Sequence, residues 1–366
     1  MNKFYPLVAK VAIVVLLWWG SLSLFARVRV EQYGVAPTFP YYSSLLTYVP
    51  ASSAVWGHFD GAHYLKLASV GYVDQGTQAF FPVYPLLIRL LHSFGLPYFT
   101  AGVFLSLTSL ILAIMALQYL LGKSIWGIAL PLLLLPTSFY FGAIYTESLF
   151  LLLTVIFFIL LKQRRYGWAA LLAGIASGTR IAGSLLVISL FIEIYPHLKK
   201  RPLLSLLLPV ALSGLFGYMY FLWREFGDPL MFVHVQSMFG AGRSSGELVL
   251  LPQVIYRYLK ILLTVSPISL LFQRALLELF VSSLFLAVLI RRWRSLPISW
   301  SIYLLGSLIL PTLSGSLSSL PRYALVIAPF LFTPPQFNTK SVAIVLTSLA
   351  LLLSLFSLFV SGQFVA

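Results

Sequence analysis

The run LLSLLLPVALSGLFGYMYFLW, residues 203–223, contains no charged side chain and decides the fold class of this chain. A run of about 18 or more apolar residues can cross the hydrocarbon core of a membrane as a helix. Apolar and polar residues do not alternate in it, as they would in a strand of a membrane β-barrel. The sequence therefore predicts a membrane-spanning α-helix here.

The composition extends this interpretation to the whole chain. Of the 366 residues, 60% are hydrophobic and only 9% are charged, whereas soluble domains carry about a quarter charged residues. Backbone groups in lipid must be satisfied within each segment, so we expect an all-α, polytopic membrane protein whose single integral domain covers residues 1–366. The expected spans lie near 7–26, 99–121, 125–142, 145–161, 203–223, 274–290, 297–313, 322–335 and 341–360, with 167–195 as a hairpin of two half-spans.

Two of these expectations have alternatives. Residues 7–26 could belong to a cleaved signal peptide, but no clear cleavage motif followed by a soluble domain is recognisable, so an uncleaved span is preferred. Residues 167–195 could form one tilted span. That arrangement would place the basic cluster after them on the opposite side from the other basic clusters, and the hairpin avoids this conflict.

The basic residues indicate the orientation. The net charge of +15 could indicate nucleic acid as a partner, but the Lys and Arg residues form small clusters between apolar runs, which is the positive-inside signal of membrane proteins. The clusters are Lys162, Arg164 and Arg165; Lys199, Lys200 and Arg201; and Arg291, Arg292 and Arg294. We expect them to face the cytoplasm of a multi-pass protein in the cell membrane that does not bind nucleic acid.

This orientation places two long loops outside, at residues 27–98 and 224–251. Seven of the nine acidic residues then lie outside or at outer helix ends, namely Glu31, Asp60, Asp74, Glu147, Glu225, Asp228 and Glu247. We therefore expect the chemistry on the extracytoplasmic face. The absence of Cys excludes disulfides and Cys-ligated metals, and no P-loop, Rossmann glycine pattern, nucleophile elbow or HExxH motif is present.

The most informative segment is WGHFDGAHY, residues 56–64. Asp60, His63 and Tyr64 stand at positions i, i+3 and i+4 of a predicted helix that Gly71 ends, so their side chains can share a face. Asp60 could act as a general base or simply cap the helix N-terminus. A metal held by Asp60, His63 and His58 is a weaker alternative, and we expect no metal.

The segment AFFPVYPLLIR, residues 79–89, is predicted to form a turn followed by a short amphipathic stretch, because Pro82 and Pro85 interrupt any long helix. Phe80, Phe81 and Tyr84 could be aromatic side chains of the membrane–water interface. Alternatively, they could support a lipid-linked substrate.

Four isolated charges complete the set of candidates. Glu147, preceded by Tyr145, begins an apolar run and either lies at the interface or faces a polar cavity. Arg180 could pair with Glu147 or bind a phosphate, and Arg322 could extend to the interface or bind a phosphate. Asp228, in the segment FGDPL, has the setting of a turn residue.

In these segments the chain resembles the PIG-V family of mannosyltransferases and their prokaryotic relatives, which belong to the GT-C class of multi-span glycosyltransferases. The matching positions are Phe59-Asp60, His63-Tyr64, Gly71-Tyr72, residues 79–87, Pro136, Phe141, Tyr145, residues 147–150, Thr179-Arg180, Gly183, residues 227–230 and residues 321–323. Two departures stand out: Phe59 replaces the usual Trp before the aspartate, and the Asn that often follows the Arg of the fourth motif is missing.

The resemblance implies a GT-C-type bundle with a long first extracytoplasmic loop and a transfer of mannose, with inversion, from a polyprenyl-phosphate donor. It implies no cofactor and an unidentified glycolipid, glycan or protein acceptor. Asp60 would be the catalytic base, and Arg180 and Arg322 would bind the donor phosphate. His63, Tyr64, Phe81, Tyr84, Tyr145, Glu147 and Asp228 would support the pocket. The alternatives are a transporter or flippase of lipid-linked saccharides, which the lack of internal repeats disfavours, and a non-catalytic accessory subunit.

Overall fold

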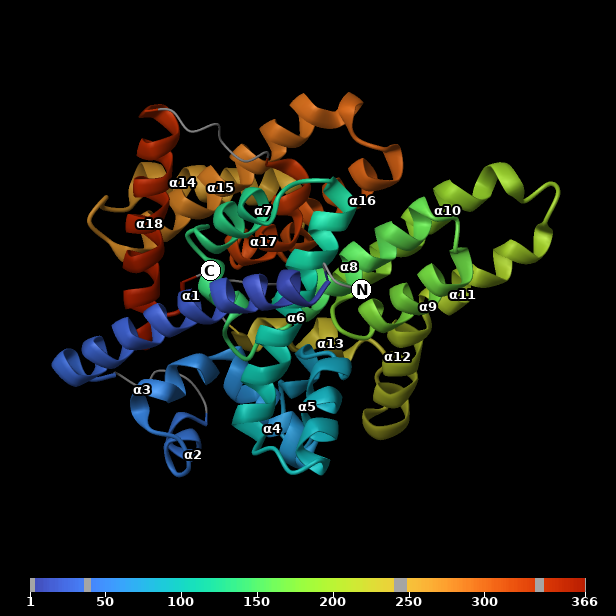
Figure 1. The fold of residues 1–366 in the computed structure, drawn as a ribbon. Helices are drawn as coiled ribbons and strands as arrows, with labels where there is room; N and C mark the ends of the chain where they lie inside the picture. Colours follow the sequence, from blue (N-terminus) through green and yellow to red (C-terminus); the bar gives the residue numbers. More distant parts are fainter. Residues whose placement is uncertain (1–3, 36–40, 240–248, 333–338, 366) are drawn as a thin grey trace. The chain divides into compact units, whose positions relative to one another are not determined.

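A computed structural model of the chain describes residues 4–35, 41–239, 249–332 and 339–365. Glu247 and the last residues of the predicted span near 322–335 lie outside this set. Within the described ranges every regular element is helical (Figure 1), which confirms the all-α prediction.

The first half of the chain contains helices that range in length from 3 to 30 residues. These are α1 (Phe4–Tyr33), α2 (Tyr42–Leu46), α3 (Ala51–Ala54), η1 (Val55–Gly57), α4 (Asp60–Val70), η2 (Thr77–Ala79), α5 (Val83–Ser93), α6 (Tyr98–Leu121), α7 (Ile125–Leu133), η3 (Ser138–Phe141), α8 (Glu147–Lys162), α9 (Tyr166–Ser177) and η4 (Ile181–Leu185), where η marks a 3-10 helix.

The second half continues in the same way. Its elements are α10 (Leu186–Ile194), η5 (Tyr195–His197), η6 (Pro202–Leu206), α11 (Leu207–Ala211), α12 (Ser213–Phe226), α13 (Met231–His234), η7 (Val235–Phe239), α14 (Leu251–Thr264), α15 (Leu270–Arg292), η8 (Trp293–Ser295), α16 (Ile298–Ile309), η9 (Leu310–Ser314), α17 (Leu320–Leu331) and α18 (Thr339–Val360).

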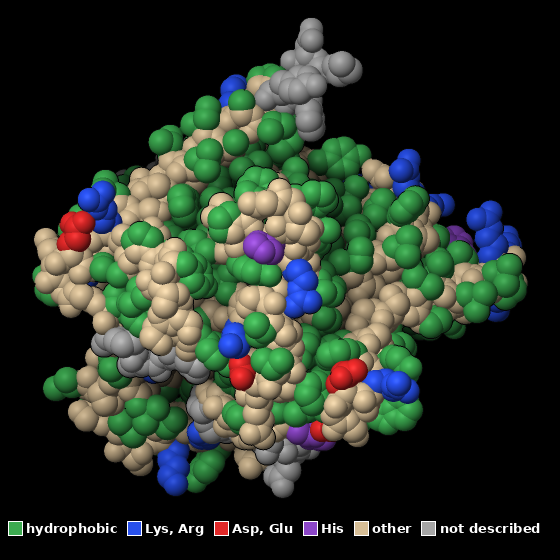
Figure 2. Space-filling view, turned by 90° about the horizontal axis from the view of Figure 1, so that it is seen from below, with side chains coloured by type: hydrophobic (Ala, Val, Ile, Leu, Met, Phe, Trp, Pro, Cys, Tyr) green, Lys and Arg blue, Asp and Glu red, His purple; other side chains and the backbone are tan. Residues whose placement is uncertain are grey.

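Four helices of the described residues are long and apolar enough to cross a membrane. They are Pro6–Tyr33, Tyr98–Leu121, Leu270–Ser295 and Val342–Val360. Only 17% of the most apolar window of the first and the last is buried inside the protein, so these two helices present most of their surface to the surroundings, as lipid-facing spans do. Figure 2 shows large hydrophobic areas on the visible face, interleaved with other side chains and backbone, and charged side chains only at scattered places.

A fifth span exists if the two helical parts of the apolar run 203–223 are counted together. Pro202–Ala211 and Ser213–Phe226 pass the same test as a pair, but they are bent by 50° at the break between them. The predicted continuous helix over 203–223 is therefore wrong in this detail. The other predicted spans coincide with shorter helices, among them α7, α8, α16 and α17, and their role as spans stays a prediction.

The chain divides into two compact units. The first comprises residues 1–71, 83–155 and 332–365, and the second comprises residues 72–82 and 156–331. In the first unit, α1 contacts α6, α7 and α18, while α4 packs against α5 and α6. In the second unit, α9 contacts α10, α11 and α12, and α15 contacts α14, α16 and α17.

The predicted outer loop 27–98 is largely helical. The helix predicted to start near Asp60 and end at Gly71 is α4, which confirms that expectation, and Tyr64, Leu67 and Ala68 form part of its buried face. The short amphipathic segment predicted after Pro82 is α5. Arg89 of α5 donates hydrogen bonds to the carbonyls of Ala68 (2.7 Å) and Leu67 (3.1 Å) and so caps the C-terminus of α4.

Candidate functional site

The candidate base Asp60 follows a strained backbone position. Phe59 has φ 52°, in the left-handed region that residues other than glycine rarely adopt. Its ring packs against Phe359 and Phe364, with ring centres 5.6 and 5.3 Å apart. The Phe59 carbonyl accepts the first turn's bond from Ala62 N–H at 3.0 Å. Strain of this kind persists only where the surroundings impose it, and it concentrates at functional sites.

The N-cap position of α4 belongs to Phe59, and the half-buried Asp60 is the first residue of the helix. A carboxylate in the first turn is stabilised by the helix dipole. Asp60 therefore lies where the helix dipole favours its negative charge. It does not occupy the N-cap position that the capping alternative requires.

His63 and Tyr64 lie one turn further along α4. The half-buried His63 ring meets the Tyr41 ring edge-on at 5.3 Å. Tyr64 is buried and meets the Tyr84 ring in a T-shaped contact at 5.0 Å. Asp60 thus shares the i, i+3 and i+4 positions of α4 with two side chains, His63 and Tyr64, that pack against other aromatic rings.

His58 does not converge with Asp60 and His63. It is fully buried, and its Nδ1 donates a hydrogen bond to the Phe359 carbonyl at 3.1 Å. Burial lowers the pKa of His58 to about 4, although the bond to Phe359 raises it in part. Within the described residues no group of three or more His, Cys, Asp or Glu side chains could hold a metal ion.

The segment before α8 is attached to the same corner. Ile144 N–H bonds to the Trp56 carbonyl at 2.8 Å, and the Tyr145 hydroxyl donates to the His58 carbonyl at 3.0 Å. A β-carbon added to Gly61 would lie 3.3 Å from the Ile144 carbonyl oxygen, so the start of α4 fits closely against this segment. Tyr145 and Asp60 therefore belong to one packed corner of the first unit.

Glu147 is the first residue of α8 and is 1% exposed. The helix start agrees with one of the two alternatives for Glu147, whereas its position at the membrane interface or beside a polar cavity stays a prediction. Burial raises the pKa of Tyr84, the hydrogen bond with Ser106 lowers it in part, and the nearby Tyr64 hydroxyl and Glu147 carboxylate raise it further. The Tyr84 hydroxyl is within 2.7 Å of Ser106 Oγ, which donates to the Ala143 carbonyl at 2.7 Å. Tyr84 thus links Tyr64 to the surroundings of Glu147.

The predicted interfacial role of Phe80, Phe81 and Tyr84 is wrong. These side chains are 7%, 5% and 0% exposed, whereas interfacial aromatics face the headgroups. In the second unit, Phe81 packs against Tyr218 and Phe232, with ring centres 5.1 and 5.4 Å apart. Prolines beside aromatics resembled an interfacial turn, but tertiary packing buries the rings.

The two candidate phosphate ligands of the second unit meet at one ring. The guanidinium carbon of Arg180 lies 4.3 Å from the centre of the Tyr323 ring, and that of Arg322 lies 5.2 Å from it. Arg180 is 9% exposed and Arg322 is 6% exposed. Residues separated by more than 140 positions in sequence therefore lie beside the same ring, and their shared role as phosphate ligands stays a prediction.

Glycines set the position of Arg180. It lies three residues after the last residue of α9, in an extended conformation, and its N–H bonds to the Ala176 carbonyl at 3.1 Å. The end of α9 packs backbone to backbone against α12, because a β-carbon on Gly214 would lie 2.1 Å from the Gly174 oxygen and 2.5 Å from the Gly178 nitrogen. Close approach through small residues is characteristic of helix pairs in membranes.

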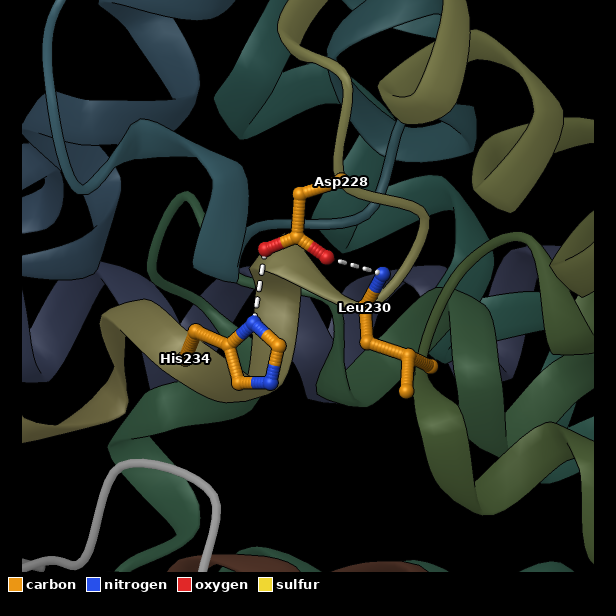
Figure 3. A network of polar contacts seen from close by, with 3 residues as sticks. All are labelled: Asp228, Leu230 and His234. Carbon is orange, nitrogen blue, oxygen red and sulfur yellow. Dashed lines mark hydrogen bonds and ion pairs between the residues drawn. The ribbon is translucent and has the colours of Figure 1, made fainter.

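Asp228 is held in a turn (Figure 3). Its carboxylate accepts bonds from Leu230 N–H at 2.9 Å and from His234 Nδ1 at 2.6 Å. Slight desolvation raises the pKa of Asp228, but the bonds from His234 and Leu230 outweigh it and lower the pKa. These contacts agree with the turn interpretation of Asp228.

Sequence reasoning missed two groups of the second unit. Tyr323 was noted only as part of a motif, although its ring lies beside both arginines. The buried pair of Tyr258 and Glu278, joined by a hydrogen bond, was not recognised at all. Glu278 is an acidic residue inside a candidate span, and that rarity was a signal that could have identified it.

In comparisons with known proteins, no family model matches this chain, and no curated protein or solved structure matches it.

Proposed function

We propose that this chain is a membrane glycosyltransferase that transfers a hexose from a polyprenyl-phosphate donor to an extracytoplasmic acceptor, and that this hexose is mannose. The observation that supports the proposal best is the pair of buried guanidinium groups beside Tyr323. Two cations in a low-dielectric setting are the groups that a departing phosphate requires, because they stabilise the charge that develops on it. Guanidinium groups bind phosphate oxygens through paired N–H donors.

In the proposed reaction, Asp60 accepts the proton of the acceptor hydroxyl. The hydroxyl oxygen attacks the anomeric carbon of the donor from the face opposite the phosphate. The bond between that carbon and the phosphate oxygen breaks, its electron pair leaves with the phosphate, and the configuration inverts. Because phosphate is a good leaving group, one base and cationic stabilisation suffice, and Asp60, Arg180 and Arg322 supply them.

The remaining candidates support these three residues. Tyr64, Tyr84 and Tyr145 pack the corner on which Asp60 stands, together with Glu147 and His63. Phe81 belongs to the aromatic cluster with Tyr218 and Phe232 that would support the lipid chain of the donor. Asp228 orders the turn that leads into α13. We assign these residues positioning roles.

The test is a transfer assay with the protein in lipid nanodiscs, a radiolabelled polyprenyl-phosphate mannose and a membrane extract as the acceptor source. We expect transfer by the wild type, loss of transfer in Asp60→Asn with folding unchanged, and retention in Glu225→Gln, which removes an exposed acidic charge. Full transfer by Asp60→Asn would refute the base. Movement of the donor across vesicles without transfer would identify a flippase, and inactivity of the wild type would favour an accessory subunit.

A further inference from the structure

The second unit contains a recess that the proposed transferase does not use. Its volume is about 460 Å³, and it lies where α8 and α10 end and α16 begins. Its lining consists of Leu161, Lys162, Arg164, Tyr166, Ile192, Glu193, Pro196, His197 and Ile298. The recess therefore combines an apolar wall with two cations, a histidine and a carboxylate.

The lining of the recess includes part of one basic cluster and lies close in sequence to the other two. Lys162 and Arg164 belong to the first cluster, His197 stands two residues before the second, and Ile298 follows the third. Clusters of this kind mark the helix ends that meet the anionic leaflet of a membrane. Basic pockets between helices at this level bind lipid head groups.

The backbone at Arg164 indicates that its side chain has a function. Helix α8 ends in a Schellman motif, in which Arg165 N–H bonds to the Leu160 carbonyl and Arg164 N–H bonds to the Leu161 carbonyl, both at 2.9 Å. The motif's left-handed position is normally occupied by glycine, but here Arg164 occupies it with φ 56°. A long cationic side chain is thus held at the edge of the recess despite the strain.

The carboxylate of Glu193 specifies the ligand further. It is half-buried, and its Oε1 accepts a hydrogen bond from Ser299 Oγ at 2.7 Å. A carboxylate in the lining would repel a bare inorganic anion but would accept a hydrogen bond from an ammonium or hydroxyl group. The His197 and Tyr166 rings, which both line the recess, lie near each other, with ring centres 6.1 Å apart.

We propose that this recess binds the head group of a membrane phospholipid whose phosphodiester faces Lys162 and Arg164 and whose amine or hydroxyl donor faces Glu193. The apolar lining, including Leu161, Ile192 and Ile298, contacts the first part of the acyl chains. The ligand class is therefore phosphatidylethanolamine or phosphatidylglycerol, which share a phosphodiester next to a hydrogen-bond donor. This proposal does not rest on the transferase function.

The experiment measures lipid binding to the full chain in detergent by native mass spectrometry. Phosphatidylethanolamine, phosphatidylglycerol and phosphatidylcholine are added in turn, and the last has the phosphodiester without the donor. We expect the first two to bind tighter than the third. The double variant Lys162→Gln, Arg164→Gln should weaken their binding roughly tenfold to thirtyfold. Lys199→Gln, Lys200→Gln removes two charges outside the recess and should leave binding unchanged.

Two further variants make the result decisive. Arg164→Gly suits the left-handed position, so it should raise thermal stability while weakening lipid binding. Glu193→Gln keeps an acceptor for Ser299 and should reduce the preference for phosphatidylethanolamine over phosphatidylcholine. Equal weakening by both double variants would overturn the site in favour of diffuse attraction. Equal binding of the three lipids, or full displacement by millimolar inorganic phosphate, would overturn the proposed ligand.

Discussion

The guanidinium carbon of Arg180 lies 4.3 Å from the centre of the Tyr323 ring. A cation over an aromatic face gains about 0.5–1 kcal/mol when exposed and about 2 kcal/mol when desolvated. Arg180 is almost fully buried, so its setting resembles the second case. Because Arg322 also lies close to this ring, a single aromatic side chain contacts both guanidinium groups.

Two substitutions of Tyr323 should therefore distinguish the contribution of its aromatic ring from that of its hydroxyl group. Tyr323→Phe keeps the aromatic face, and we expect donor binding and transfer close to those of the wild type. Tyr323→Leu removes the face, and we expect a loss of about tenfold in kcat/KM, corresponding to about 1.4 kcal/mol. Transfer kinetics at varied donor concentration measure both. An equal loss in the two variants would show that the hydroxyl, and not the ring, positions the arginines.

The contact between α9 and α12 predicts a sharp difference between two glycines of one helix. A β-carbon at Gly214 would meet backbone atoms of α9 at 2.1–2.8 Å, whereas at Gly217 nothing lies within 4 Å. We expect Gly214→Ala to destabilise the protein by about 1–3 kcal/mol or more through overpacking and to reduce transfer by displacing Arg180. Thermal unfolding in detergent measures the stability.

Gly217→Ala is the matched control for this substitution. Alanine in an unobstructed helix position should be neutral or stabilise by about 0.5–1 kcal/mol. If Gly214→Ala were as stable and as active as Gly217→Ala, the close packing of α12 on α9 would not be what sets Arg180 in place.

Local patterns predicted the elements that local forces determine. The periodicity after Asp60 and the glycine at position 71 predicted α4 with its buried face, since a helix and its C-terminal glycine are encoded within a few residues. The sequence also singles out Arg180 and Arg322, because isolated cations in apolar sequence are rare, and their common role as phosphate ligands stays a prediction. Their meeting at Tyr323 depends on tertiary contacts.

Features that depend on distant contacts were not predictable in the same way. Hydropathy over 203–223 is continuous, but Pro209 and the close approach of Gly214 to α9 accompany a bend that hydropathy does not encode. Phe80 and Phe81 resemble interfacial residues until their packing partners are known. The partner of Glu278 stands 20 residues earlier, on another helix.

His58 predicts a specific dependence of stability on pH. Its pKa is about 4 in the folded protein, below the value near 6.5 of an unfolded chain. Between these values the unfolded chain binds a proton that the folded protein does not. The stability that the neutral, buried His58 contributes is therefore fully present above pH 6.5 and is lost as the pH decreases toward 4. The expected loss is on the order of 3 kcal/mol.

His58→Asn retains a donor for the Phe359 carbonyl but has no titrating group. Thermal unfolding of both proteins between pH 4 and 7 should show a smaller decrease in the variant, because acidic residues contribute equally to both. Parallel curves would contradict the burial of a neutral His58.

The last prediction concerns the loop that leads into α17 and thus to Arg322. The Tyr258 hydroxyl donates to the Glu278 carboxylate and accepts a bond from Leu317 N–H at 2.9 Å. Burial and the Glu278 charge raise the pKa of Tyr258, so the hydroxyl stays protonated at neutral pH.

We expect Tyr258→Phe to destabilise the protein by about 1–3 kcal/mol, because buried polar groups lose a partner. Tyr256→Phe, at a position 68% exposed on the same helix, should have no effect. In a double-mutant cycle with Glu278→Gln, the two substitutions should couple by about 0.5–3 kcal/mol. Strict additivity would mean that the pair does not hold the loop, and transfer by Tyr258→Phe at the wild-type rate would mean that the loop does not position Arg322.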